Sequence, residues 1–482
     1  MKVIIVGGGT AGWMTAAALS KGFPEYDITI FKGDDPIGVG ESTTPHIQQY
    51  LNYMGIDDAT FLKAARATYK SSSRFEDFYT VGHSFHYPNG QTWKEFPSIS
   101  QWMQAKAFYP EHCPPFADTF MPFVAVAAEG KMPVEHSLLS PYDISQDRSF
   151  HIDGSKFSAY LQENFCSNVR VDGRKVKSVR YAGRRIASLF LERGPYDNRA
   201  PQVDADLYID CTGQASTLGG AMSTWIPFDS ILTDSAIIEK VDYTDKDKEM
   251  VPYTNAKGMW AGWQWTIPTW DYISRGYVFS SKYRSVEGAR EESGLHEGKH
   301  ITFRNGRYDK AWVGNCVSIG LSYGFIEPLE STSLFNTHHG ILALVDTLKE
   351  GVPGSFARDR FNYNLAEHMD GWKEFVEAHY YYSSRRDSPF WEAVTNEVEY
   401  DIKGAHQMVQ DYMVTSHDWH VDDPIVFILA GSEYSNINTR IYPEGLVTED
   451  QVKNWSMLHG KVKTLCATMP TMHKYLKDTI FS

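Results

Sequence analysis

The sequence has 482 residues, of which 42% are hydrophobic and 14% aromatic, and its formal net charge is −14. This composition supplies a large packed core, which excludes a disordered, fibrous or disulfide-stapled protein. The acidic balance repels phosphate backbones and anionic lipids, so we expect no nucleic-acid partner and no role at a membrane surface.

The cysteines and the hydropathy indicate the compartment. Five widely spaced cysteines without a CxxC pair support neither a disulfide framework nor a zinc ribbon. No segment is apolar enough over about 20 residues to span a bilayer. We therefore expect a cytoplasmic protein, whose acidic surface permits a homo-oligomer.

The N-terminus has the pattern of a dinucleotide-binding βαβ unit. Residues 3–6 form a short β-branched run, typical of a buried parallel strand, and a glycine-rich turn and a helical stretch over 13–19 follow. A second strand is predicted over 28–31. In such a unit the glycines allow a tight turn, and a pyrophosphate approaches the backbone at the start of the helix. The turn residues predicted to bind the dinucleotide are Gly7, Gly9, Thr10, Ala11 and Gly12.

One feature of this unit departs from the usual pattern. The position about 20 residues further on, where an acidic side chain normally binds the ribose hydroxyls, is Lys32. Asp34 or Asp35 could reach the ribose instead, or the adenosine half could be held loosely. A lysine would also suit a 2′-phosphate, which we rank below a flavin cofactor.

Further along the chain, the pattern predicts a mixture of elements. Residues 57–69 are predicted to be helical, with Asp57 or Asp58 as the cap, and residues 81–145 to be an irregular insertion or lid. Alternating residues over 169–191 indicate antiparallel hairpins, and residues 205–211 indicate an apolar strand.

The C-terminal third is predicted to be mostly helical. A helix over 334–349 ends near Gly351, and most of 355–482 has helical character. The N–H groups of Thr332 and Ser333 at the start of that helix form an anion site. We predict two closely packed parts: a dinucleotide-binding domain over 1–350 with the insertion at about 81–145, and a mainly helical domain over 351–482.

Several motifs, in chain order, resemble those of the flavin-dependent halogenases of the tryptophan-halogenase family. They are the Gly7-x-Gly9-x-x-Gly12 turn, Gly38-Val39-Gly40-Glu41, Thr68-Tyr69-Lys70 leading to Arg74-Phe75, Trp263-Gln264-Trp265-Thr266-Ile267-Pro268, Glu327-Pro328-Leu329-Glu330-Ser331-Thr332, and His379-Tyr380 with Arg386-Asp387-Ser388-Pro389-Phe390-Trp391. The resemblance covers residues 1 to about 391. It implies an α/β fold with a Rossmann-like FAD-binding domain of the GR2 or aromatic-hydroxylase type, mixed sheets and a mainly helical C-terminal substrate domain.

The resemblance also implies the cofactors and the reaction. FAD, delivered as FADH2 by a separate flavin reductase, reacts with O2 to give a C4a-hydroperoxide, and a bound chloride, bromide or iodide attacks its distal oxygen. The resulting hypohalous acid moves through an internal tunnel and halogenates an electron-rich, indole- or phenol-like substrate. The positions that match the cofactor site are Gly7, Gly9, Thr10, Ala11, Gly12, Gly38, Val39, Gly40, Glu41, Gly320 and Leu329.

The catalytic residues implied by the resemblance are Lys70 and Glu330. Lys70 would hydrogen-bond the oxygen of the hypohalous acid or form a haloamine, and Glu330 would orient that species and take the proton from the arenium intermediate. Thr332 and Ser333 match the halide site. Family members that bind chloride often have glycine where Ser333 stands, so the halide preference stays open.

Trp263 and Trp265 alternate on a predicted strand and therefore face the same side. With Ile267 and Pro268, they match the family's barrier between flavin and substrate, although core packing alone would also explain two such tryptophans. Candidates for holding the substrate ring are His86, Tyr87 and Trp391, of which His86 falls near a family position that stacks on the substrate. We predict no metal site, because no carboxylate or cysteine has ligand spacing.

Two rival functions remain at this point. One is a flavin-dependent aromatic hydroxylase, which would need its own NAD(P)H reduction step. The other is a flavin-binding protein that has lost catalysis, against which the presence of both Lys70 and Glu330 argues. The tyrosine-rich segment of tryptophan-specific family members is not evident in residues 400–482, so free tryptophan is a doubtful substrate.

Overall fold

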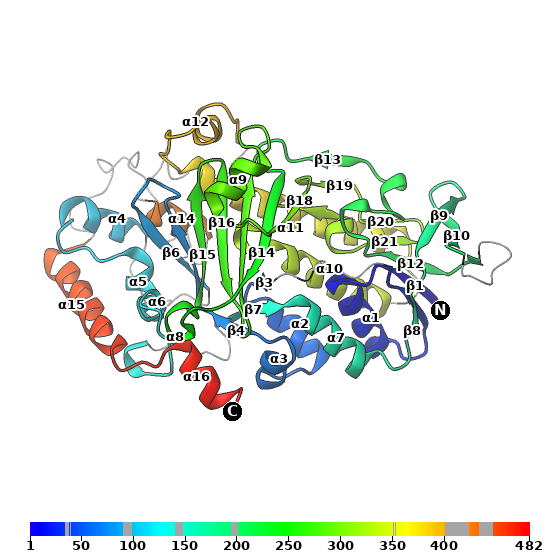
Figure 1. The fold of residues 1–482 in the computed structure, drawn as a ribbon, viewed down its shortest axis with the longest axis horizontal. Helices are drawn as coiled ribbons and strands as arrows, with labels where there is room; N and C mark the ends of the chain where they lie inside the picture. The colour runs from blue at the N-terminus through cyan, green and yellow to red at the C-terminus, as the bar shows by residue number, and fades with distance from the viewer. Residues whose placement is uncertain are drawn as a thin grey trace. The chain divides into compact units, whose positions relative to one another are not determined.

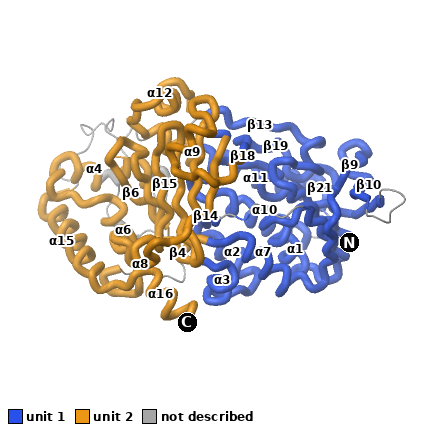
Figure 2. The backbone as a smooth tube through the Cα atoms, viewed as in Figure 1, with its two compact units in different colours: residues 1–67, 152–234, 302–373 blue, residues 68–151, 235–301, 374–482 orange. Residues whose placement is uncertain are grey.

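The structure is a computed structural model that describes residues 1–33, 38, 40–89, 99–139, 148–193, 201–349, 351, 353–400, 424–432 and 447–482. The chain forms two compact units, each built from three separate stretches (Figure 2). Unit 1 comprises Met1–Ala67, Ile152–Asp234 and Thr302–Lys373. Unit 2 comprises Thr68–His151, Ser235–Ile301 and Glu374–Ser482.

Unit 1 is built around a six-stranded sheet in the order β20-β21-β12-β1-β2-β8. Its strands are β1 (Lys2–Val6), β2 (Asp27–Phe31), β8 (Arg170–Asp172), β12 (Leu207–Asp210), β20 (Trp312–Val313) and β21 (Cys316–Ser318). All neighbouring pairs are parallel except β20 with β21. β1 lies between β2 and β12, so the chain order reverses direction at β1, which is where ligands bind in open α/β sheets.

Helices cover this sheet. They are α1 (Thr10–Gly22), α2 (Ile47–Met54), α3 (Asp58–Ala64), α7 (Gly154–Phe165) and α10 (Thr332–Lys349). Both α7 and α10 pack on α1, which also contacts β1 and β2, and Figure 1 shows α7 next to α1. The residues of α1 from Gly12 to Ser20 are buried, consistent with an apolar helix packed between neighbours.

Small sheets extend unit 1. One contains β9 (Val176–Tyr181), β10 (Ile186–Leu191) and β11 (Gln202–Val203); another contains β13 (Trp225–Pro227), β19 (Gly306–Tyr308) and β22 (Gly324–Phe325). The short β3 (Gly40–Ser42) overlaps the end of the glycine motif at 38–41. Leu189 and Leu191 of β10 join a core cluster with Ile4 and Tyr208 of the main sheet.

Unit 2 is built around a seven-stranded sheet in the order β18-β14-β17-β16-β15-β5-β6. Its strands are β5 (Ser72–Glu76), β6 (Ser84–Pro88), β14 (Ser235–Val241), β15 (Tyr253–Met259), β16 (Gly262–Pro268), β17 (Ile273–Phe279) and β18 (Lys299–Thr302, whose last residue belongs to unit 1). β5 and β15 are parallel neighbours. The pairs β14–β17, β17–β16 and β16–β15 are antiparallel (Figure 1). Outside this sheet, β4 (Thr68–Lys70) pairs with β7 (Ser149–Asp153, whose last two residues belong to unit 1).

The helices of unit 2 come from three chain regions. They are α4 (Ile99–Phe108), α5 (Phe116–Phe120), α6 (Pro122–Ala128), α8 (Lys246–Glu249), α9 (Val286–Ser293), α12 (Pro389–Asn396), α14 (Pro424–Gly431), α15 (Glu449–Cys466) and α16 (Met472–Thr479). α11 (Ser355–Tyr381) begins in unit 1 and ends in unit 2. α15 packs on α6, so this C-terminal helix contacts the segment before residue 130.

The predicted α/β fold with mixed sheets is confirmed, and β1, β2, α1, β12 and α10 form where the sequence predicts them. The described part of 355–482 is mostly helical, as expected. The division into domains at residue 350 stays a prediction.

The predicted helix over 57–69 is wrong in its second half. Asp57 caps α3 as expected, because its carboxylate accepts a hydrogen bond from the Thr60 N–H. The helix ends at Ala64, and Arg66 adopts a positive φ of 48°. Thr68–Lys70 instead form β4, because β-branched and aromatic residues there pair with β7.

Two other segments differ from expectation. The described residues of 81–145 form β6 and the helices α4 to α6, so this segment is more regular than the predicted lid. Within 169–191, β9 and β10 form the expected antiparallel hairpin, but β8 pairs parallel with β2. β8 extends the main sheet, and a single-sequence pattern does not reveal that pairing.

Candidate active site

A cavity of about 610 Å³ lies in unit 1 at the carboxyl ends of its central strands. Its wall includes residues that directly follow β1, β2 and β12, among them Gly7, Lys32 and Cys211. The predicted cofactor-binding residues that line it are Gly7, Gly9, Thr10, Ala11, Gly38 and Glu41. Gly12, Gly40, Gly320 and Leu329 are not among its described wall residues, and Val39 lies outside the described part of the chain.

The glycine turn is shaped by close backbone packing. Gly7 has a φ of +115°, and an added Cβ there would lie 2.1 Å from the Cys211 carbonyl oxygen. A Cβ at Gly12 would lie 1.9 Å from the Gly7 carbonyl oxygen. These two glycines therefore let β1, α1 and the end of β12 approach one another, which brings the first N–H groups of α1 to the cavity wall.

Glu41 is a titratable group of this wall. Burial raises the pKa of its carboxyl to about 7, the hydrogen bond from Thr10 lowers it, and the nearby Asp153 carboxylate raises it. The Thr10 hydroxyl donates to Glu41 Oε1 over 3.3 Å. Near neutral pH a substantial fraction of Glu41 is therefore uncharged, so it repels a phosphate ligand less than an ordinary carboxylate would.

Three cations also line the cavity: Lys32, Arg174 and Lys175. Arg174 Nε lies 3.0 Å from both carboxylate oxygens of Asp172, and this pairing holds the pKa of Asp172 below its usual value. Lys32 departs from the usual motif in the sequence itself, whereas no sequence pattern points to Arg174 and Lys175. Only the parallel pairing of β8 with β2 places them beside Lys32.

The described wall fits a dinucleotide such as FAD. The glycine turn and the first N–H groups of α1 supply the donors that a pyrophosphate needs, and the three cations offset its charge.

The start of α10 forms a second polar wall of the same cavity, which Ser333 and Thr337 line. The Oγ1 atom of Thr332 and the Oγ atom of Ser333 are buried and have no hydrogen-bond partner within the described structure. The first N–H groups of a helix are likewise free of intrahelical partners. Two hydroxyls and these N–H groups make this helix start suited to a small anion.

Glu330 lies directly before this helix start and is 4% exposed. It ends the short 3₁₀ turn η5 (Pro328–Glu330), and Ser331 follows with a left-handed φ of +61°. The turn is anchored by Asn305, whose Nδ2 donates to the Thr233 carbonyl oxygen over 2.7 Å and whose Oδ1 accepts from the Glu327 N–H over 2.8 Å. The hydrogen bonds of Asn305 thus fix the turn that positions the buried carboxylate of Glu330.

Lys70 is the last residue of β4 in unit 2, and only 1% of its surface is exposed. It pairs with Ser149 of β7, whose hydroxyl donates to the Lys70 carbonyl oxygen over 3.1 Å. Asn89 in turn donates to the Ser149 hydroxyl over 2.7 Å. A lysine held this deeply differs from the solvated surface lysine that composition alone would suggest.

Trp263, Trp265 and Ile267 share one face of β16 and are buried, as predicted for a barrier strand. The two indole rings lie 6.1 Å apart between centroids. Gly276 of the neighbouring β17 makes room for Trp265, because a Cβ there would lie 2.1 Å from the indole ring. Trp265 also donates to the Ser274 hydroxyl over 3.3 Å.

The predicted substrate residues have different surroundings. His86 lies on β6, where its Nδ1 is 2.9 Å from the Ser72 hydroxyl, and burial lowers the pKa of its imidazole to about 4. Tyr87 packs against Phe375 and Phe427. Both residues lie on β6. This strand pairs with β5, which begins at Ser72, two residues after Lys70.

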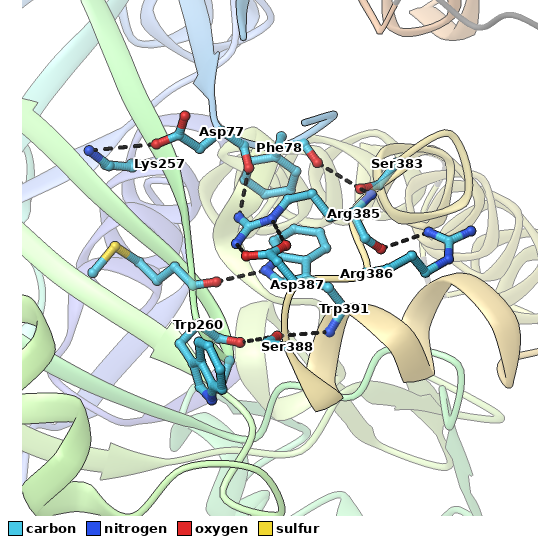
Figure 3. A network of polar contacts seen from close by, with 12 residues as sticks. Asp77, Phe78, Lys257, Trp260, Ser383, Arg385, Arg386, Asp387, Ser388 and Trp391 are labelled. Atoms are coloured by element: carbon cyan, nitrogen blue, oxygen red, sulfur yellow. Dashed lines mark hydrogen bonds and ion pairs between the residues drawn. The ribbon is translucent and has the colours of Figure 1, made fainter. Parts of the chain in front are cut away.

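Trp391 belongs to a buried polar network shown in Figure 3. Its indole N–H donates to the Met259 carbonyl oxygen over 2.7 Å, and the Arg385 guanidinium lies 4.3 Å from its ring centroid. Arg385 also forms a two-pronged pair with Asp387 and donates to the Asp77 carbonyl oxygen over 2.7 Å. The motif at residues 386–391 therefore fastens α12 to the strands of unit 2.

The structure groups the predicted residues by unit. Unit 1 brings together the cavity, Glu330, Thr332 and Ser333, whereas unit 2 brings together Lys70, the barrier strand and His86. In the described residues, no group of three or more His, Cys, Asp and Glu side chains is arranged to hold a metal ion. Of the helices that the structure describes, none is long and apolar enough to cross a membrane.

Comparison with known proteins identifies the family. The family model for tryptophan halogenase matches residues 2–428. Tryptophan 6-halogenase SttH from Streptomyces toxytricini is 32% identical over 427 residues, which cover 81% of this chain and 80% of that protein.

Solved structures agree with this match. The structure of VirX1 is 31% identical with a TM-score of 0.88, and the match covers 100% of this chain and 99% of that one. Xcc4156, a flavin-dependent halogenase from Xanthomonas campestris, is 25% identical with a TM-score of 0.83, covering 99% and 98% of the two chains. The resemblance seen in the sequence is confirmed: the chain belongs to the tryptophan-halogenase family and is a flavin-dependent halogenase.

Proposed function

We propose that this enzyme halogenates an electron-rich indole- or phenol-like substrate, with Lys70 and Glu330 as its catalytic residues. The observation that carries the proposal is the deep burial of both side chains, 1% and 4% exposed, at the motif positions of a halogenase family. A buried ammonium and a buried carboxylate are costly unless a function retains them.

The cavity of unit 1 is proposed as the FAD site. Gly7, Gly9, Thr10 and Ala11 would face the pyrophosphate, while Lys32 would lie at the adenosine side beside the end of β2. When bound and reduced, FAD supplies, together with O2, the oxidising equivalents that convert halide to hypohalous acid. The proposal includes a separate flavin reductase as the source of FADH2 and a cytoplasmic location.

Thr332 and Ser333 are proposed to hold the halide. Their buried hydroxyls, which lack partners within the described residues, and the N–H groups at the start of α10 supply donors for an anion. Ser333 also lines the proposed FAD cavity, so a halide held there would be adjacent to the cofactor.

In the proposed halogenation step, Lys70 donates a hydrogen bond to the oxygen of hypohalous acid and polarises the oxygen–halogen bond. The arene attacks the halogen, a carbon–halogen bond forms, and the oxygen–halogen bond breaks to release hydroxide. Glu330 takes the proton from the ring carbon, and hydroxide with one proton gives water. Trp263 and Trp265 are proposed to separate the cofactor from the substrate.

Substitution of Lys70 tests the proposal. With FADH2 supplied by a flavin reductase, and with chloride, bromide and iodide in parallel, the wild-type enzyme is incubated with a panel of indoles, including tryptophan, and phenols. Mass spectrometry is expected to show halogenated product from the wild type and the exposed control Lys299→Ala, and none from Lys70→Ala, while FADH2 oxidation continues in all three. Normal halogenation by Lys70→Ala would contradict the proposed mechanism, and a hydroxylated product would point to a hydroxylase.

A further inference from the structure

A buried histidine lies beside Lys70 and takes no part in the proposed chemistry. His151 is on β7, is 0% exposed, and stands opposite Thr68, two residues before Lys70 on β4. Its two ring nitrogens contact hydroxyls on different strands: Nδ1 is 3.2 Å from Thr68 Oγ1, and Nε2 is 2.9 Å from Thr254 Oγ1. Buried side chains with both nitrogens engaged are held in one orientation.

The hydrogen bonds fix which nitrogen carries the proton. The Thr68 hydroxyl donates its single proton to the Pro268 carbonyl oxygen over 2.5 Å. Toward His151, the same oxygen therefore accepts, so Nδ1 carries the imidazole proton. A neutral imidazole then accepts at Nε2 from the Thr254 hydroxyl.

The imidazole is neutral for a physical reason. Burial lowers the pKa of His151 well below its usual value, and the positive charge of Lys70 lowers it further. A carboxylate at this position would pair with the Lys70 ammonium, and a protonated imidazole would repel it. The neutral ring can fix the surrounding strands without competing for the ammonium.

The chain of bonds joins four strands around Lys70. Pro268 ends β16, the strand of Trp263 and Trp265; Thr68 is on β4, His151 on β7 and Thr254 on β15. On the other side of Lys70, the Ser71 N–H donates to the Pro252 carbonyl oxygen over 2.8 Å. The segment around Lys70 is thus held by two hydrogen bonds. One joins Thr68 to Pro268 at the end of the barrier strand, and the other joins Ser71 to Pro252, the residue before β15.

We propose that His151 is a positioning residue for Lys70, which fixes the register of β4 against the end of the Trp263–Pro268 strand through Thr68 and Thr254. The inference rests on the proposed catalytic role of Lys70. It predicts that losing His151 leaves FADH2 oxidation and hypohalous acid formation intact but lets the oxidant escape unused. A displacement of about 1 Å in a catalytic group costs about 100-fold in rate, so a modest shift of β4 is sufficient.

The main test compares His151→Phe with His151→Asn. Phe removes both hydrogen-bonding nitrogens, whereas the Asn amide nitrogen retains a donor near the position of Nδ1. Product is measured by mass spectrometry with the best arene of the panel, FADH2 oxidation by absorbance, and escaped hypohalous acid by monochlorodimedone. We expect His151→Phe to lose about 10- to 100-fold in product per FADH2 oxidised, with a matching rise in trapped oxidant, and His151→Asn to recover a large part of it.

A second variant covers the case in which His151→Phe does not fold. Thr254→Val removes only the hydroxyl that donates to Nε2 and keeps the shape of the side chain. Its matched control is Thr119→Val, because Thr119 is likewise a buried threonine of unit 2, but its hydroxyl donates to the Pro115 carbonyl oxygen rather than to a histidine. We expect oxidant escape to rise in Thr254→Val and to stay at the wild-type level in Thr119→Val.

A measurement without cofactor or substrate completes the design. Amide hydrogen exchange of the peptide that covers residues 68–71 is expected to speed up in His151→Phe and Thr254→Val, and to stay unchanged in Thr119→Val. The double variant His151→Phe with Lys70→Ala should release as much trapped oxidant per FADH2 oxidised as Lys70→Ala alone, because His151 acts through Lys70.

The outcomes separate the two proposals. If wild type and Lys70→Ala halogenate equally, the proposed function fails. If Lys70→Ala is inactive but His151→Phe and Thr254→Val convert oxidant to product as efficiently as wild type, the positioning role of His151 alone is overturned. A lowered melting temperature with unchanged product per FADH2 would likewise overturn it, since that is the result of a purely structural role.

Discussion

Single residues of the cofactor cavity show how burial sets chemistry. Glu41 and Lys32 both line the cavity. Glu41 belongs to a family motif, whereas Lys32 stands where an acidic residue is usual. The structure adds Arg174 and Lys175 to the same wall. The charge that a pyrophosphate would meet is therefore set by residues from three separate parts of the chain.

Glu41 makes stability depend on pH. Its pKa is raised from 4.5 to about 7, so the folded state binds a proton more tightly than the unfolded state. The stabilisation is fully present below about pH 4.5 and is lost as the pH rises through about 7. We expect the difference in unfolding free energy between wild type and Glu41→Gln, measured by urea titration, to fall between pH 5 and pH 8 by up to about 1.4 kcal/mol per pH unit. The exposed substitution Glu163→Gln is the control, and a pH-independent difference for Glu41→Gln would contradict the prediction.

Gly7 combines a positive φ with a close backbone contact, whereas Gly183 has a positive φ of 61° and open space for a Cβ among the described residues. Gly183→Ala is expected to cost about 1 kcal/mol from backbone strain alone. Gly7→Ala should cost several times more, because its Cβ would overlap the Cys211 carbonyl oxygen. Thermal unfolding of the ligand-free proteins measures both, and equal costs would show that the contact is relieved without penalty.

At the scale of elements, the start of α10 is the helix end that we propose binds the halide. Thr332→Val removes one of the two buried hydroxyls but keeps the N–H groups of the helix. Loss of one hydrogen bond to an anion costs about 1 kcal/mol or more, so the bromide concentration for half-maximal product formation should rise about fivefold or more. Thr347→Val is the matched control, since Thr347 lies on the same helix and donates only to the Ala343 carbonyl oxygen. An unchanged bromide dependence in Thr332→Val would remove that hydroxyl from the halide site.

Substitution of Arg385 measures how much its hydrogen-bond network (Figure 3) contributes to the unfolding free energy. Arg385→Lys keeps the charge but loses the planar fork that binds Asp387, the Asp77 carbonyl and the face of Trp391. We expect a loss of about 2 kcal/mol in unfolding free energy. Arg170→Lys, in an exposed pair with Asp27 whose arginine side chain is 69% exposed, should change stability little. Similar effects of the two substitutions in urea unfolding would contradict this account.

At the scale of the whole molecule, the two units interleave along the chain. Unit 2 needs residues 374–482 in addition to its two earlier stretches, so a fragment of residues 1–373 contains unit 1 but only part of unit 2. The fragment would expose apolar surface that α12, α14, α15 and α16 bury in the full chain. We expect it to aggregate or to lack cooperative unfolding in circular dichroism, with the full-length protein as control. A monomeric, cooperatively folding fragment would show that unit 1 is independent.

Elements set by neighbours in the chain could be predicted from the sequence, whereas elements set by contacts between distant residues could not. Local signals were sufficient for β1, the glycine turn, α1 and the start of α10, because glycine, β-branched runs and helix starts act through neighbours in the chain. The same local signals misassigned residues 65–69, where pairing with β7, about 80 residues away, overrides helix propensity. That correction matters for function, since it places Lys70 on a strand.

The amino-acid sequence by itself determined the family, the class of cofactor and the identity of the two proposed catalytic residues, because these depend on residue types at fixed spacings. Only the tertiary structure decided that Lys70 is buried, that Lys32 has Arg174 and Lys175 beside it, and that His151 connects four strands near Lys70. Burial, pKa shifts and hydrogen-bond partners arise from contacts between residues that are distant in the chain, and a pattern along one sequence does not contain those contacts.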